Sequence, residues 1–166
     1  MVNDADRADS AGRPFRILLV CEANVCRSPM AEYLLRKGLS SKGADTRVFE
    51  LSSAGTHADD GAEMDPRTVE QLARLNVSPN GFRSHTLTDK DLDDADLILT
   101  ATRAQRSLLL ERLPTALRRS FTMLEFAQTA RQVRSRWPNL REPKGRTGPV
   151  DRGRPRQCPG AGIRRG

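Results

Sequence analysis

The chain has 166 residues, three cysteines and a formal net charge of +7. This length fits one domain with a sizeable core, and three cysteines, two of them (Cys21 and Cys26) in one short segment, do not make a disulfide framework. No apolar run approaches membrane-spanning length, and the polar segment 1–13 lacks the apolar core of a signal peptide, so we expect a cytoplasmic protein without membrane insertion.

Most of the net positive charge arises at one end of the chain. Residues 140–166 carry eight Lys or Arg and two Asp or Glu, a net of +6, whereas the other 139 residues carry 20 and 19, a net of +1. Only one Trp and one Tyr could stack on bases. This distribution indicates a basic tail rather than a basic folded surface, and it predicts no nucleic-acid partner.

The first expected elements surround a short loop. We expect residues 1–13 to be disordered and the apolar run 17–20 to form a strand, followed by a helix over 29–40. Between them lies a loop that opens on Cys21. Ser28 suits an N-cap and Pro29 the first helical position, so the helix is predicted to begin there.

Later segments continue the alternation of strand and helix. Strands are predicted over 47–51, 96–101 and 121–123, and helices over 66–75, 103–113 and 124–133. The pattern predicts a single three-layer α/β domain, with a central parallel sheet of about four strands and helices on both faces. Residues 140–166 are rich in Pro, Gly and Arg and are predicted to be disordered, which leaves 14–139 as the domain.

The loop after the first strand carries the clearest chemical signal. Cys21 and Arg27 are separated by five residues, and Ser28 follows directly. Such a loop can curl around a tetrahedral dianion, because backbone N–H groups, a helix N-terminus and a guanidinium all favour negative charge there. The same surroundings stabilise a thiolate, so Cys21 is a candidate nucleophile toward phosphorus.

Four segments give a specific resemblance. The run Val-Cys-Glu-Ala-Asn-Val-Cys-Arg-Ser-Pro over 20–29 resembles the VCxGNxCRSP signature of low-molecular-weight protein tyrosine phosphatases. Ser-Ala-Gly-Thr over 53–56, Met-Asp-Pro-Arg over 64–67 and Ala-Asp-Leu-Ile-Leu over 95–99 fall in that family's order. The resemblance implies a monomeric enzyme with no cofactor or metal, acting on a phosphotyrosine-containing protein or a small phosphomonoester.

The resemblance also implies roles for the loop residues. Cys21 would take the phosphoryl group as a cysteinyl-phosphate, Arg27 would hold two oxygens, and Ser28 would donate to the thiolate. Asn24 would hold the loop in a left-handed bend with support from Ser53. Cys26 would form a protective disulfide with Cys21 under oxidation. The expected phosphate-binding loop comprises Glu22, Ala23, Asn24, Val25, Cys26 and Ser28.

Several positions depart from the family pattern. Ala23 stands where a Gly is usual and would be strained if its φ were positive. Thr102 stands near a position that usually carries Asp, and the segment 82–85 lacks an expected leading His, which puts one polar link to the loop in doubt. His57 and His85 show no metal spacing and are interpreted as solvated loop residues.

The largest departure concerns the general acid, which in the family is an Asp followed by Pro on a late loop. The one late Asp here is Asp151, in Pro-Val-Asp-Arg, and it is the candidate proton donor; Glu142, which precedes a Pro, is a weaker candidate.

Three other functions remain open on the sequence. An arsenate reductase would need resolving cysteines that the chain lacks between Cys26 and Cys158. Phosphoarginine phosphatases carry Thr before the second loop cysteine, where Val25 stands here. Without a general acid, the domain could be a phosphate-binding module that does not turn over.

Overall fold

The computed structural model describes residues 13–43 and 47–136. The prediction of disorder for 140–166 lies outside these ranges, as does that for 1–13 except at Arg13, which is described and pairs with Asp96 at 2.7 Å. The boundaries of the expected domain stay a prediction. Within the described ranges, no helix is both long enough and apolar enough to cross a membrane.

A four-stranded parallel sheet forms the centre of the molecule, in the order β2-β1-β3-β4. The strands are β1 (Phe15–Cys21), β2 (Phe49–Gly55), β3 (Leu97–Thr100) and β4 (Ser120–Thr122). The run 17–21 of β1 is buried throughout, as a central strand covered on both faces requires.

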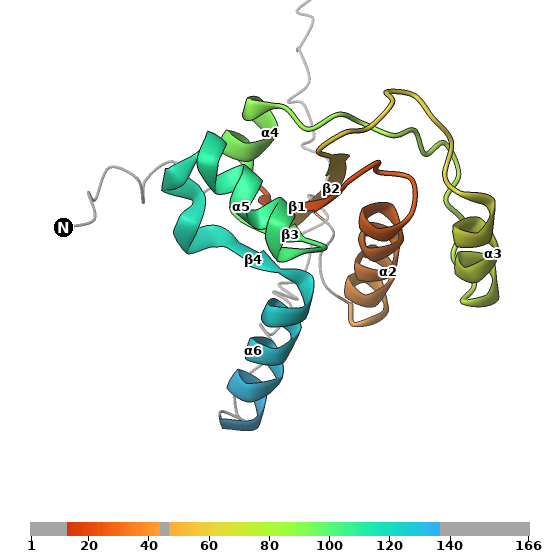
Figure 1. The fold of residues 1–166 in the computed structure, drawn as a ribbon. Coiled ribbons are helices and arrows are strands. Elements are labelled where there is room, and N and C mark those ends of the chain that lie inside the picture. The colour runs from red at the N-terminus through yellow and green to blue at the C-terminus, as the bar shows by residue number, and fades with distance from the viewer. Residues whose placement is uncertain (1–12, 44–46, 137–166) are drawn as a thin grey trace, which may run out of the picture.

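Helices cover both faces of this sheet (Figure 1). Leu18 and Val20 of β1 face a cluster that includes Leu92 and Leu109, whereas Leu19 faces the opposite cluster, against which α2 packs. The helical elements are α2 (Arg27–Ser41), α3 (Pro66–Arg74), α4 (Asp89–Asp94), α5 (Arg103–Arg112), the 3-10 helix η1 (Pro114–Arg119) and α6 (Met123–Arg136). The predicted three-layer α/β architecture is therefore confirmed.

Several predicted bounds are wrong by two to four residues, and two elements were missed. The second strand runs over 49–55 rather than 47–51, because its serines pair in register with β1, Leu19 lying opposite Ser53. Helix α2 begins at Arg27, two residues before the predicted start, and Cys26 is its N-cap. The sequence analysis missed α4 and η1, although Thr88 and Asp91 form a capping box that marks the start of α4.

Candidate active site

The loop from Cys21 to α2 lies at the carboxyl end of the central strand, where parallel α/β sheets bind ligands. Backbone hydrogen bonds fasten it to its surroundings: Thr56 N–H donates to the Cys21 carbonyl (3.0 Å) and His57 N–H to the Glu22 carbonyl (2.9 Å). On the other side, the Asp65 N–H donates to a carbonyl of the loop at residue 25 (2.9 Å). The loop is thus held in place before any anion arrives.

Asn24 is the buried centre of the loop. Its backbone φ is 51° and its side chain has no exposed surface. Its Nδ2 donates to Ser28 Oγ (2.9 Å) and to Ser53 Oγ (3.0 Å), and its Oδ1 accepts from the His85 N–H (2.8 Å). The expected bend and the expected support from Ser53 are both present. Asn tolerates this left-handed conformation better than most residues.

Cys21 and Ser28 meet inside the loop. Both are buried, and Cys21 Sγ lies 2.9 Å from Ser28 Oγ. Because Asn24 donates to Ser28 Oγ, the hydroxyl keeps its own proton for the sulfur or for the more distant Ala54 carbonyl (3.4 Å). The prediction that Ser28 caps α2 was wrong, since the helix begins one residue earlier and has no side-chain cap.

Gly55 allows the loop to lie against β2. A Cβ at this position would stand 2.5 Å from the Glu22 carbonyl oxygen and 2.9 Å from the Asn24 amide nitrogen. The backbones therefore approach more closely than any side chain permits. The sequence analysis assigned a role to Ser53 of this segment but none to Gly55.

Arg27 and Cys26 are more exposed than Cys21 and make their own contacts. The Arg27 side chain is half exposed, with Nη2 3.7 Å from a Glu22 carboxylate oxygen. Cys26 is exposed, and its sulfur accepts from the Thr68 hydroxyl at 3.1 Å. This contact ties the loop to α3, whose N-cap is Asp65.

The structure shows how the chain accommodates its departures from the family pattern. Ala23 is not strained, because Asn24 and Asn76 are the non-glycine residues with positive φ in the described part of the chain. The polar link in doubt at 82–85 is supplied by the His85 backbone, which bonds Asn24 and Gly55. The imidazole of His85 lies 2.9 Å from Asp91 and is not simply solvated.

The other two residues that the sequence singled out lie at the edge of the site. Thr102 caps α5 by accepting from the Gln105 N–H at 3.2 Å. The imidazole of His57 lies 3.1 Å from the Thr56 hydroxyl.

Asp60, in the segment that follows β2, accepts a hydrogen bond from the Thr86 N–H. Hydrogen bonds from the Thr86 backbone and then its side chain hold the pKa of Asp60 below its ordinary value. Asp151 and Glu142, the candidate donors, lie outside the described residues. No group of three or more His, Cys, Asp or Glu that could hold a metal occurs within 13–43 and 47–136.

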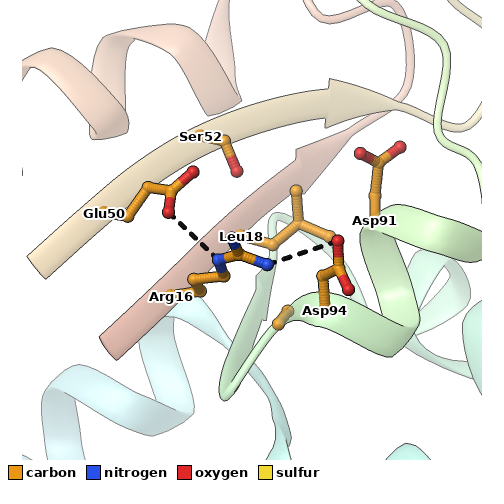
Figure 2. Close-up of a pocket in the computed structure, with 7 residues that line it drawn as sticks. Arg16, Leu18, Glu50, Ser52, Asp91 and Asp94 are labelled. Atoms are coloured by element: carbon orange, nitrogen blue, oxygen red, sulfur yellow. Dashed lines mark hydrogen bonds and ion pairs between the residues drawn. The ribbon is translucent and has the colours of Figure 1, made fainter. Parts of the chain in front are cut away.

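A hollow lies at the amino-terminal end of β1, opposite to the loop (Figure 2). Arg16 bridges Glu50 (3.0 Å) and Asp94 (3.3 Å) there, and Leu18 lies beside them. The charges satisfy one another, so this hollow is a site of ion pairing between β1, β2 and α4.

Comparison with known proteins agrees with this geometry. The family model described as low molecular weight phosphotyrosine protein phosphatase matches residues 16–145. The chain belongs to this family. The family resemblance predicted from the sequence is therefore confirmed.

Individual relatives of this low molecular weight phosphatase fall into two named kinds. It is 33% identical over 113 residues to a protein-arginine-phosphatase of Geobacillus stearothermophilus, and 36% identical over 112 residues to the probable low molecular weight protein-tyrosine-phosphatase EpsP of Ralstonia solanacearum. Each match covers 68% of this chain and 72% of the relative. The crystal structure of YfkJ from Bacillus subtilis superposes with a TM-score of 0.66 at 28% identity, covering 70% of this chain and 74% of that one. These names do not favour an arsenate reductase.

Proposed function

We propose that this protein is a metal-independent protein-tyrosine phosphatase that works through a cysteinyl-phosphate. The observation that carries the proposal is the buried Cys21 sulfur, 2.9 Å from Ser28 Oγ, in a loop held by Asn24 at the carboxyl end of β1. The N-terminus of α2 begins at the end of this loop and favours the charge of a phosphate. Family membership supports the same reaction class.

The reaction proceeds in two displacements. The Cys21 thiolate attacks phosphorus, the P–O bond to the leaving group breaks, and the leaving oxygen takes a proton. Water then attacks the same phosphorus, the S–P bond breaks, and inorganic phosphate and the thiolate are released. The Ser28 hydroxyl stabilises the thiolate each time it forms, and Arg27 turns from Glu22 toward two equatorial phosphate oxygens.

The test is hydrolysis of p-nitrophenyl phosphate in the presence of a metal chelator. Cys21→Ser should abolish turnover without changing the circular dichroism spectrum or the Tm. Cys158→Ser, the matched control in a cysteine far from the loop in sequence, should retain activity. Undiminished turnover by Cys21→Ser, or a strict need for added divalent metal, would refute the proposal.

Phosphoarginine is the second candidate substrate, because a relative of similar identity is named as an arginine phosphatase. Val25 supports the tyrosine assignment: the resemblance places a Thr at this position in the arginine-specific proteins. Hydrolysis of a phosphotyrosyl peptide should exceed that of the matching phosphoarginyl peptide. Val25→Thr should move the ratio toward phosphoarginine, and a wild-type preference for phosphoarginine would reverse the assignment.

We further propose Asp151 as the proton donor to the leaving group. General acid catalysis contributes about 10²–10⁴-fold, and its loss matters most when the leaving group is basic. Asp151→Asn should therefore slow phosphotyrosine hydrolysis about a hundredfold and p-nitrophenyl phosphate hydrolysis much less. Equal, small effects on both substrates would show that Asp151 is not the donor.

A further inference from the structure

A groove runs beside the phosphate loop toward α5. It begins at the loop itself, continues along the segment that follows β2, and ends on the first turns of α5. Its lining residues are Glu22, Arg27, Thr56, His57, Thr102, Ala104, Gln105 and Leu108. A residue that flanks a phosphorylated residue bound in the loop can therefore reach this surface.

Most polar groups of the groove are already engaged with one another. The Thr102 hydroxyl accepts from the Gln105 N–H, and the Gln105 side chain accepts from the Thr102 N–H at 3.0 Å. The Thr56 hydroxyl is within hydrogen-bond distance of the His57 ring at 3.1 Å. Because these groups already have hydrogen-bond partners, a ligand in the groove need not supply new ones.

What remains open for recognition is an apolar surface next to a carboxylate. Leu108 is 37% exposed although it is a large aliphatic residue, and Ala104 lies one helical turn before it on α5. At the loop end of the same groove stands the carboxylate of Glu22, which is 67% exposed.

Phosphate binding would remove the ion-pair partner of Glu22. In the structure, the Glu22 Oε2 atom lies 3.7 Å from Arg27 Nη2. When Arg27 turns to hold phosphate oxygens, the carboxylate loses this partner and remains beside a dianion, which repels it. A cation placed in the groove relieves that repulsion, whereas an acidic side chain there adds to it.

We propose that the groove binds a lysine or arginine side chain that flanks the phosphotyrosine of a protein substrate. The aliphatic stem lies on Leu108 and Ala104, and the cationic end meets Glu22. Long basic side chains commonly bury their methylene stems in this way while their charge stays at the surface. The inference rests on the proposed phosphatase function, and it makes Glu22 and Leu108 specificity-determining residues.

The experiment uses two phosphotyrosyl peptides that differ only in carrying Lys or Glu on both sides of the phosphotyrosine. The full-length wild type should show a kcat/KM for the Lys peptide about three- to tenfold above that for the Glu peptide, since the charges are partly exposed. Glu22→Gln should reduce this ratio to near unity, and Leu108→Ser should lower kcat/KM for the Lys peptide. The ratio should also fall as salt is raised, because exposed charges are screened.

Glu63→Gln is the matched control. Glu63 is also an exposed glutamate, but it pairs with Arg83 at 3.5 Å and does not line the groove. This variant should keep the wild-type preference. Hydrolysis of p-nitrophenyl phosphate, which has no flanking residues, is measured for every variant.

The outcomes separate this inference from the proposed function. Equal rates on the two peptides with p-nitrophenyl phosphate turnover intact would overturn the groove assignment alone. A Lys preference that survives in Glu22→Gln, or disappears in Glu63→Gln, would overturn it as well. A wild type that hydrolyses neither p-nitrophenyl phosphate nor a peptide would overturn both.

Discussion

Gly55→Ala should damage the active site through a single added methyl group. The new Cβ would lie 2.5 Å from the Glu22 carbonyl oxygen, and ordinary contact begins near 3.4 Å, so the loop backbone must retreat by about 0.9 Å. The conflict involves backbone atoms, which cannot rotate aside as the end of a flexible side chain can. Misplacement of a catalytic group by about 1 Å can cost about 10²-fold in rate, so we expect a loss of that order in kcat/KM.

The assay for Gly55→Ala is p-nitrophenyl phosphate hydrolysis alongside chemical denaturation. Overpacking costs about 1–3 kcal/mol of unfolding free energy, so the variant should still fold. Gly38→Ala is the control, because a Cβ there meets nothing within 4 Å and lies in α2, where Ala is favoured over Gly. Activity of Gly55→Ala within about twofold of wild type would refute the argument that this close approach positions the loop.

Three further outcomes are expected. Asn24→Ala should lower the free energy of unfolding by about 1–3 kcal/mol and reduce turnover, because its hydrogen-bond partners are left unsatisfied in a buried loop; unchanged denaturation midpoints would contradict this. Asp65→Ala should cost about 1 kcal/mol in urea unfolding by removing the N-cap of α3, and Asp65→Ser should recover most of it. Mild peroxide should inactivate reversibly by joining Cys21 to Cys26, seen as a loss of two hydrogens by mass spectrometry. Cys21 sulfinic acid with Cys26 still free would speak against that protective role.

The sequence predicted the layers of the fold because each layer has a local signal. Continuous apolar runs in β1 and β3 are typical of buried parallel strands, and Asp65 followed by Pro is typical of a helix start. The end of β2 was missed because Ser52 and Ser53 resemble turn residues. They belong to the strand because β1 pairs with them, a tertiary effect that no local pattern contains.

The sequence predicted the side chains of the candidate site but not the backbone contacts that hold them together. Cys21 and Ser28 could be chosen from their spacing, and the structure brings them together. The part played by the His85 backbone could not be predicted, since a main-chain N–H has no side-chain signature. The steric role of Gly55 likewise depends on which backbone lies next to it.

The hydrogen bonds of Asn24 have a consequence for how activity arises during folding. Its side chain joins residues of its own loop to Ser53 and to His85, the latter 61 positions further along the chain. A peptide that contains only the loop therefore lacks the groups that shape it, and a growing chain lacks them until His85 has been added. Turnover should return in a refolding experiment together with long-range tertiary structure and not with early helix formation, so the rate of p-nitrophenyl phosphate hydrolysis serves as a direct readout of the native population.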